Sequence, residues 1–186
     1  MTQAKGPGES PLLLLDVIKL LDRLQIPYAV IGALAASFYG VIRMSVDADA
    51  VVSLRSTGAN IQALVMELRK AGLRTTQARG DMGDPIGAVL KVEDGFENRV
   101  DLLMDIRGVE EDVFFRTVEA KVAGKPVRLV GVEDFIAMKI FAGSPKDLAD
   151  VAGVLKVSGK KINKALLKKL VQGYGKAASR KLESLL

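Results

Sequence analysis

Two aspartates separated by one residue begin an apolar run, in the segment Asp47-Ala48-Asp49-Ala50-Val51-Val52. Such a run predicts a buried β-strand, and residues i and i+2 of a strand point to the same face. At roughly 3.3 Å per residue, the two carboxylates lie about 7 Å apart along the chain. A fold that contains this strand must therefore place two negative charges on one face of a sheet and supply them with a partner.

A third carboxylate, Asp101, lies in a second strand pattern, Arg99–Ile106. Its apolar neighbours share one face of the strand, and Asp101 points to the other face, with Asp105 further along on the same side. Three carboxylates from neighbouring strands can hold one or two divalent cations together with a triphosphate. We therefore expect Asp47, Asp49 and Asp101 to form a metal site.

The other side chains narrow the chemistry of such a site. The sequence contains no cysteine and no histidine. Thiol nucleophiles, disulfides, histidine-ligated zinc and Ser-His-Asp catalysis are therefore excluded. Carboxylates, lysines and arginines remain, and carboxylate oxygens are typical ligands of hard cations. The expected metal is Mg²⁺ or Mn²⁺.

A glycine turn precedes the acidic pair. The apolar run Tyr28–Ile31 predicts a short buried strand, and Gly32-Ala33 then opens a helix of small residues that ends at Gly40. A glycine at such a turn lets the backbone approach an anion, and free amides at the helix start point toward it. Arg43 is placed either to contact a phosphate or to form an ion pair with an aspartate.

The hydrophobic pattern indicates an α/β (α+β) fold with a mixed central sheet flanked by helices. Ser10 and Pro11 predict a helix start, with the Ser10 hydroxyl as its cap. The expected elements are helices at 10–24 and 60–71, strands at 48–54, 73–78, 86–92 and 99–106, and a hairpin at 119–130 turning at Gly124-Lys125. We expect residues 1–131 to form this body, with the Gly/Pro-containing segment 1–9 lacking fixed structure.

The C-terminal third, residues 132–186, is helical in pattern, with breaks near 143–145, 158–159 and 173–175. Residues 151–186 carry 9 of the 27 basic residues and only 1 of the 22 acidic ones. The basic residues are Lys156, Lys160, Lys161, Lys164, Lys168, Lys169, Lys176, Arg180 and Lys181. They either attract nucleic-acid phosphates or form the solvated side of helices that dock through apolar faces.

Nothing in the sequence predicts a membrane segment. The most apolar stretch, around Pro11–Leu15, is interrupted by Asp16 and Lys19 and is far shorter than the roughly 20 residues of a membrane-spanning helix. No signal-peptide cleavage pattern follows it. We therefore expect a cytoplasmic protein without a membrane partner.

Two longer segments carry a resemblance to a known group. The first is Ile31-Gly-Ala-Leu-Ala-Ala-Ser-Phe-Tyr-Gly-Val-Ile-Arg-Met-Ser-Val-Asp-Ala-Asp49, and the second is Glu133-Asp-Phe-Ile-Ala-Met-Lys-Ile-Phe-Ala-Gly-Ser-Pro-Lys-Asp-Leu-Ala-Asp150. A glycine turn, a short helix and an Asp-x-Asp pair are typical of the nucleotidyltransferase superfamily, which has a polymerase-β-like fold. The combination with a later lysine and a Lys-Asp pair resembles the AbiEii-like branch, known from type IV toxin–antitoxin systems, over roughly residues 26–151.

This resemblance implies Mg²⁺-dependent transfer of a nucleoside monophosphate from a nucleoside triphosphate to an acceptor, with release of pyrophosphate. It implies that the three aspartates Asp47, Asp49 and Asp101 are catalytic, binding the metal, with Asp101 also deprotonating the acceptor hydroxyl. The residues that it implies for nucleotide binding are Gly32, Ala33, Arg43, Lys139, Lys146 and Asp147. Asp147 has an alternative role as the cap of the helix that follows it.

Three functions stay open at this point. The leading prediction is an enzyme that modifies tRNA or a partner protein, in a toxin–antitoxin or defence pair. The second is transfer to a small molecule, as in antibiotic-modifying relatives. The third is a nucleotide-binding or interaction module without catalysis, because Ala33 replaces the usual second Ser or Gly and Ser144 lies where the branch often has arginine.

Overall fold

The computed structural model describes residues 3–55, 60–81 and 83–185. The strands are β1 Tyr28–Val30, β2 Asp47–Val52, β3 Arg74–Arg79, β4 Ile86–Glu93, β5 Arg99–Ile106, β6 Val118–Val122 and β7 Lys125–Leu129. The helices are α1 Ser10–Arg23, α2 Gly32–Phe38, α3 Ile61–Lys70, α4 Val132–Ala142, α5 Pro145–Ser158, α6 Lys164–Gly173 and α7 Lys176–Glu183, with short 3₁₀ turns η1 Glu111–Phe114 and η2 Gly159–Lys161. The expected hairpin and helix breaks are confirmed.

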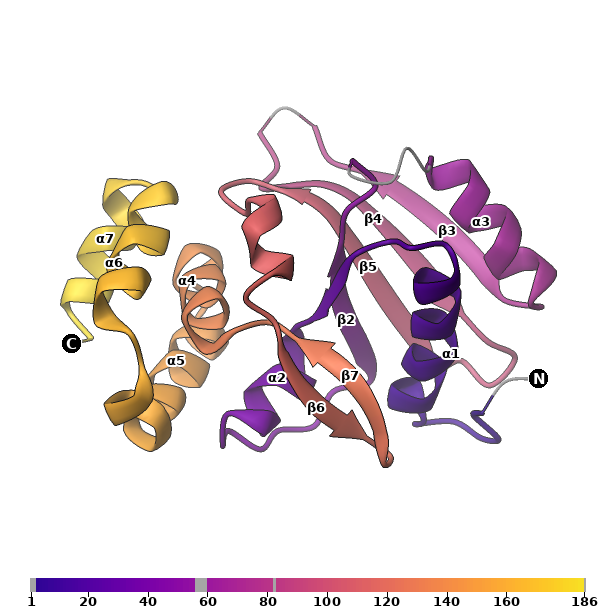
Figure 1. The fold of residues 1–186 in the computed structure, drawn as a ribbon, viewed down its shortest axis with the longest axis horizontal. Helices are drawn as coiled ribbons and strands as arrows, with labels where there is room; N and C mark the ends of the chain where they lie inside the picture. The colour runs from indigo at the N-terminus through magenta and orange to yellow at the C-terminus, as the bar shows by residue number, and fades with distance from the viewer. Residues whose placement is uncertain (1–2, 56–59, 82, 186) are drawn as a thin grey trace.

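The strands form one seven-stranded sheet in the order β3-β4-β5-β2-β1-β7-β6 (Figure 1). β2 runs parallel to β5 and β1 parallel to β7, whereas the other neighbours are antiparallel. The prediction of a mixed sheet flanked by helices, with a helical C-terminal third, is confirmed.

Helices α1 and α3 cover one face of the sheet (Figure 1). The alternate residues of β2 and β5 that point to this face are almost fully buried, and they are Ala48, Ala50, Val52, Val100, Leu102 and Met104. The residues between them point to the opposite face, as the alternation of a strand requires. The aspartates of β2 and β5 therefore lie on the face that α1 and α3 leave open.

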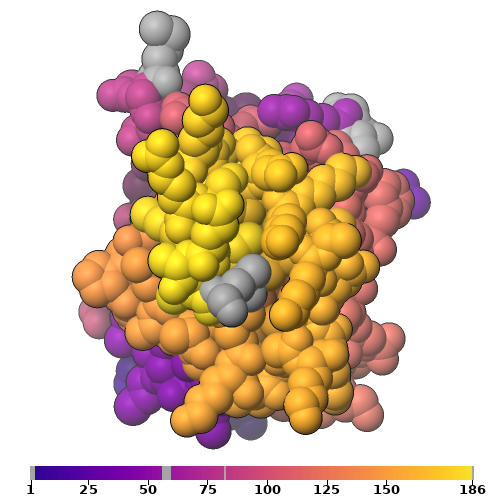
Figure 2. Space-filling model, turned by 90° about the vertical axis from the view of Figure 1, so that its left-hand side faces the viewer, coloured from indigo at the N-terminus to yellow at the C-terminus, as the bar shows by residue number. Residues whose placement is uncertain are grey.

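The C-terminal helices pack around α4, which contacts α5, α6 and α7. They lie on the far side of the sheet from α1 and α3 in Figure 1, and they dominate the end-on face in Figure 2. The buried core continues from α1 through the sheet into α4, α6 and α7, so these helices are part of one packed body. Within the described residues, none of the helices has the length and apolar character that crossing a bilayer requires.

Ser10 does not cap α1, contrary to the prediction from its position. Glu9 is the N-cap residue, and Ser10 is the first residue inside the helix. The buried Ser10 hydroxyl instead donates to the Val46 carbonyl at 2.6 Å and accepts from the Arg99 amide at 3.0 Å. A buried hydroxyl must find partners, and here the starts of β2 and β5 supply them. Ser10 therefore joins the two strands just before their aspartates.

Residues 3–9 make contacts with distant parts of the chain, whereas residues 1–2 of the predicted segment 1–9 lie outside the described residues. The Gln3 amide donates to Asp16 of α1 at 2.6 Å, and the Ala4 side chain is buried. The Asn98 side chain donates to the Gly6 carbonyl at 2.9 Å and accepts from the Glu9 amide at 2.6 Å. These contacts with distant residues order a segment whose composition gives no sign of it.

Candidate active site

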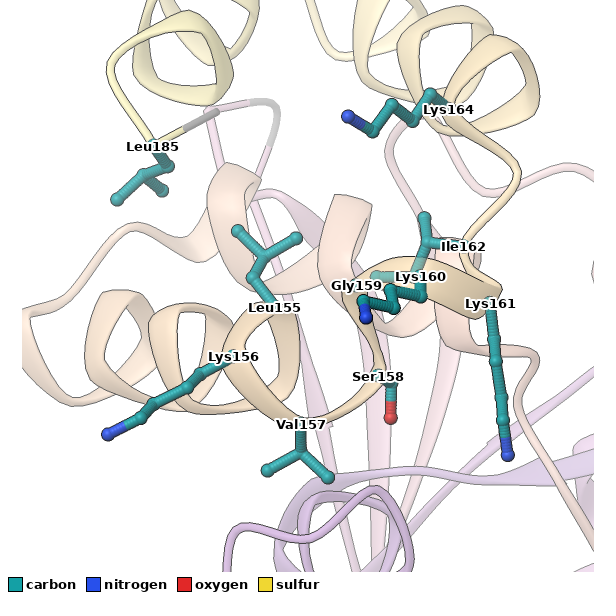
Figure 3. Close-up of a pocket in the computed structure, with 10 residues that line it drawn as sticks. All are labelled: Leu155, Lys156, Val157, Ser158, Gly159, Lys160, Lys161, Ile162, Lys164 and Leu185. Atoms are coloured by element: carbon teal, nitrogen blue, oxygen red, sulfur yellow. The ribbon is translucent and has the colours of Figure 1, made fainter.

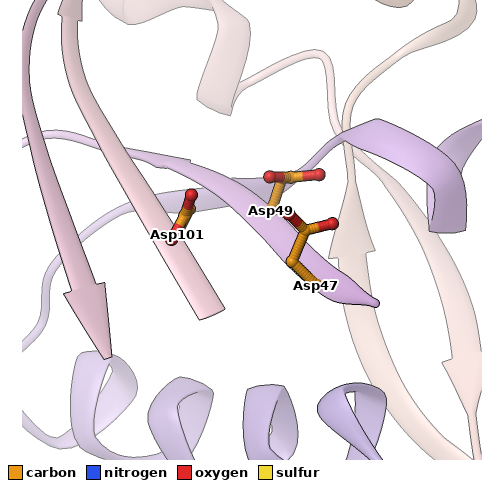
Figure 4. Close-up of side chains that lie close together, drawn as sticks. All are labelled: Asp47, Asp49 and Asp101. Atoms are coloured by element: carbon orange, nitrogen blue, oxygen red, sulfur yellow. The ribbon is translucent and has the colours of Figure 1, made fainter. Parts of the chain in front are cut away.

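The structure brings the three predicted carboxylates together. β2 and β5 pair in parallel register, so that Asp49 lies directly beside Asp101. One carboxylate oxygen from each of Asp47, Asp49 and Asp101 lies within 4.8 Å of the others (Figure 4). The expected cluster is therefore present at the open face of the sheet, where the two strands run side by side.

The charges of this cluster are poorly compensated. Burial, followed by the charges of Asp47 and Asp101, raises the pKa of Asp49 to about 6, although the more distant Lys139 and Arg43 act in the opposite direction. Burial also raises the pKa of Asp101. The Oδ1 atom of Asp101 is buried and has no hydrogen-bond partner. The cluster therefore lacks positive charge at its centre.

A hard divalent cation would compensate the negative charge of the three aspartates. The cluster offers only oxygen ligands, carries three carboxylates, and includes one buried oxygen with nothing to bind. A cation bound here would neutralise the cluster and would polarise a phosphoryl group beside it. The arrangement indicates a divalent metal site.

Gly32 lies against this cluster. Its backbone has φ +64°, and a Cβ added to it would stand 2.1 Å from Asp49 Oδ2. The Ile31 amide also donates to the Asp49 carbonyl at 2.9 Å. The turn into α2 and the acidic strand are thus in direct contact, which only a residue without a side chain permits. Ala33, the next residue, is buried and does not line the cavity described below.

A pocket of about 500 Å³ adjoins Gly32 and Asp49. Its walls come mainly from the ends of β4 and β5 on one side and from α4 on the other. The apolar side chains lining it are Ile31, Pro85, Ile86, Leu103, Ile106, Phe135, Met138, Phe141 and Ala142. Phe141 stacks on Tyr174 with ring centroids 4.6 Å apart, which fixes that wall. The pocket is therefore lined largely by apolar side chains, with Arg43, Lys139 and Asp147 near Asp49 and with Arg107 just after the end of β5.

Two cations and two anions form a network of ion pairs at the end of the pocket near Asp49. Its members are Arg43, Lys139, Asp147 and Asp150. Lys139 Nζ lies 2.6 Å from Asp147 Oδ1 and 3.1 Å from Asp150 Oδ2. Arg43 Nε lies 3.3 Å from the same oxygen of Asp150. Arg43 and Lys139 line the pocket, and Arg43 makes the ion pair that the sequence left as one of its two options.

Sequence comparison now identifies the group to which the chain belongs. Residues 14–185 match the family described as nucleotidyl transferase of unknown function (DUF2204). The chain belongs to this family. It is thus a nucleotidyltransferase, and its three clustered aspartates agree with that assignment. No curated protein sequence matches it.

Solved structures share the fold of this nucleotidyltransferase. The antibiotic-resistance factor ANT(2″)-Ia has a TM-score of 0.61 at 18% identity, over 95% of this chain and 94% of that one. An antigenic nucleotidyltransferase-like protein from Paracoccidioides brasiliensis has 0.54 at 16%, over 98% and 94%. The lincosamide antibiotic adenylyltransferase LnuA has 0.51 at 10%, over 82% and 99%. These findings confirm the superfamily and the fold, but they do not show the AbiEii-like branch or a toxin–antitoxin role.

Several predicted residues fall outside the nucleotidyltransferase site or have a second role in it. Lys146 is exposed on the first turn of α5 and does not line the pocket. Asp147 lines the pocket and also caps α5, in a capping box with Ser144. Asp105 is exposed, pairs with Arg55 at 2.5 Å and stays outside the cluster.

The sequence reading missed the apolar pocket and the burial of Asp150. A signal for the pocket was present in α4, whose apolar residues Val132, Phe135, Ile136, Met138, Ile140 and Phe141 surround the helix on all sides. A helix of this kind is buried on more than one face. For Asp150 no local signal existed, because its partners come from distant parts of the chain.

Proposed function

We propose that this nucleotidyltransferase moves a nucleoside monophosphate from a nucleoside triphosphate to a hydroxyl of a small molecule. The observation that carries the transfer reaction is the carboxylate cluster, whose Asp49 lines a partly open pocket of about 500 Å³ that can take the nucleotide. Asp47, Asp49 and Asp101 would hold Mg²⁺, which supplies charge neutralisation to the phosphates when bound. The other groups at this end of the pocket bind and orient the substrates.

The proposed transfer forms one bond and breaks one, and it needs no reactant besides the nucleotide and the acceptor. The acceptor oxygen forms a bond to the α-phosphorus, and the bond from that phosphorus to the oxygen bridging the β-phosphate breaks. Pyrophosphate leaves with the electron pair. The proton of the acceptor hydroxyl passes to Asp101, whose Oδ1 atom has no hydrogen-bond partner and is therefore free to accept it.

We assign the nucleobase to the apolar part of the pocket and the phosphates to its charged end. Gly32 leaves room for a close approach to the backbone, and Arg43 and Lys139 supply positive charge. Flat walls such as that of Phe141 suit a heterocycle. A polyhydroxylated or polycationic molecule would leave its polar groups unpaired there, at a cost of about 1–3 kcal/mol each.

The small-molecule acceptor is supported by the structural relatives. ANT(2″)-Ia was solved in complex with adenylyl-2″-tobramycin, and LnuA was solved with lincomycin bound. A macromolecular acceptor, tRNA or a partner protein, is the second candidate. Its support is the basic surface where α5 leads into α6: Lys156, Lys160, Lys161 and Lys164 surround a hollow of about 830 Å³ (Figure 3).

The test is to incubate the protein with each α-labelled nucleoside triphosphate, Mg²⁺, and separated small-molecule and macromolecular fractions of a lysate. The control is Asp47→Asn/Asp49→Asn. We expect label on a small molecule, and this transfer should change little with added salt or in Lys160→Gln/Lys161→Gln/Lys164→Gln. Label on RNA or protein that falls steeply with salt would support the second candidate. Triphosphate binding with no label in any fraction would indicate a module without catalysis.

A further inference from the structure

Asp150 is the most deeply buried member of the charged network beside the pocket. Its side chain is 3% exposed, compared with 18% for Arg43 and 14% for Lys139. A carboxylate removed from water to this extent is costly unless cations compensate it. The two cations reach it from different parts of the chain: Arg43 from the segment that leads into β2, and Lys139 from α4. Asp150 thus connects the acidic strand with the helical wall.

The geometry of these contacts leaves the cations able to bind something else. Asp150 Oδ2 and Arg43 Nε are close, yet both lack a hydrogen-bond partner, so their attraction is electrostatic without an aligned bond. Lys139 makes one hydrogen bond, to Asp147 at 2.6 Å, and only an ionic contact to Asp150. An ammonium group has three donors and a guanidinium five. Donors therefore remain at the pocket wall, where both cations lie.

We propose that Asp150 is a positioning residue, which holds Arg43 and Lys139 at the pocket wall so that both meet the phosphates of the nucleotide. Asp150 does not line the pocket, so it touches neither the substrate nor the reacting atoms. The inference rests on the proposed binding of a nucleoside triphosphate in this pocket. It adds a residue whose charge acts only through the two cations that it orients.

A second buried aspartate on the C-terminal helices provides a matched control. Asp134 of α4 has a side chain that is 7% exposed, and it binds Arg116 through two hydrogen bonds of 2.8 Å each. Both carboxylate oxygens are engaged there, and neither residue lines the nucleotide pocket. Asp134→Asn should therefore lower the free energy of unfolding without changing affinity for the nucleotide.

The experiment compares the affinities of the intact protein for two probes, ATP with Mg²⁺ and adenosine, by isothermal titration calorimetry. Asp150→Asn keeps the shape of the side chain and removes its charge. We expect it to weaken ATP binding at least about tenfold, because Arg43 and Lys139 are no longer held where they meet the phosphates. Adenosine has no phosphate, so its binding should stay within about twofold. A purely structural role would weaken both probes equally, or neither. Asp134→Asn should leave the ratio of the two affinities as in the wild type.

Variants of Arg43 cover the case in which Asp150→Asn folds poorly, and a double-mutant cycle extends the test where it folds. Arg43→Gln alone should weaken ATP binding at least about tenfold, and Arg43→Lys, which keeps the charge facing Asp150, should restore most of it. Combining Arg43→Gln with Asp150→Asn should cost less than the sum of the two single changes. Wild-type ATP affinity in Asp150→Asn, or full additivity with Arg43→Gln, would overturn the inference. Failure of the wild type to bind ATP, GTP and CTP alike would instead overturn the proposed function.

Discussion

Gly32 packs directly against Asp49. A Cβ atom on Gly32 would stand 2.1 Å from Asp49 Oδ2, which is well inside contact distance. Gly32 also has φ +64°, a left-handed conformation that glycine adopts more readily than other residues. The glycine of the turn is therefore required by the carboxylate behind it as well as by any phosphate in front of it.

Gly32→Ala should reduce nucleotide transfer by about 100-fold, because Asp49 has to move by a substantial part of an ångström to avoid the new methyl group. Gly72→Ala is the matched control. Gly72 has φ +83° but nothing within 4 Å of an added Cβ, so that change introduces only the backbone strain. Steady-state transfer rates of both variants check the prediction. A rate for Gly32→Ala equal to that of Gly72→Ala would show that the contact with Asp49 has no effect beyond backbone strain.

Asp49→Asn should stabilise the metal-free protein near neutral pH. The pKa of Asp49 is raised from 3.8 to about 6, so the folded state binds its proton more tightly than the unfolded state does. Stability from this group is present below about pH 4 and is lost as pH rises through about 6. Removing the charge should add up to about 3 kcal/mol to the free energy of unfolding at pH 7. Urea denaturation with a chelator, at pH 4 and pH 7, checks this.

Addition of Mg²⁺ should reverse that order of stability. The wild type gains stability from a cation that binds only the folded state, whereas Asp49→Asn has lost a ligand and gains less. Thermal melting with and without Mg²⁺ measures both gains. Equal gains in the two proteins would contradict a role for Asp49 in binding the metal.

Asp101→Asn should lower transfer by about 1,000-fold, because it removes both a carboxylate ligand and the proposed proton acceptor. Asp105→Asn, four residues along the same strand, is the control: Asp105 is exposed, pairs with Arg55 and lies outside the cluster. Its transfer rate should stay within about twofold, since an exposed pair contributes little. Single-turnover rates with saturating nucleotide separate the two variants.

The pocket should select nucleotides by the size of the base. Among the described residues that line it, no side chain carries an amide or a hydroxyl, and the guanidinium of Arg107 already donates to the Gly83 and Asp84 carbonyls. Stacking on apolar walls favours purines, by about tenfold or more, but hardly distinguishes adenine from guanine. Competition between ATP, GTP and CTP for binding checks the order. A strong preference for ATP over GTP would indicate that backbone groups recognise the base.

Ser10→Ala should destabilise the protein by about 1–3 kcal/mol, because the Val46 carbonyl and the Arg99 amide, both in part-buried hydrogen bonds, lose their shared partner. Ser184→Ala is the control, since its exposed hydroxyl bonds only to the nearby Lys181 carbonyl. Urea denaturation of the two variants gives the difference. A loss of transfer activity larger than the loss of folded protein would show that Ser10 also aligns β2 and β5.

The sequence by itself determined the strands, most of the helices and the face on which the aspartates lie. These features depend on local periodicity: alternation along β2 places Asp47 and Asp49 on one side, and the same rule places Asp101 on the corresponding side of β5. The glycine turn before Asp47 and the helix breaks at 143–145 and 173–175 are equally local, since they follow from backbone preferences of single residues.

Tertiary structure alone decided which of these groups meet. The parallel register of β2 and β5 puts Asp101 rather than Asp105 into the cluster. Ser10 became a bridge between strands instead of a helix cap, and Asp150 became the buried partner of Arg43 and Lys139. In each case a polar group excluded from water takes whichever partner the fold brings within reach. That partner is distant in sequence, so no local pattern encodes it.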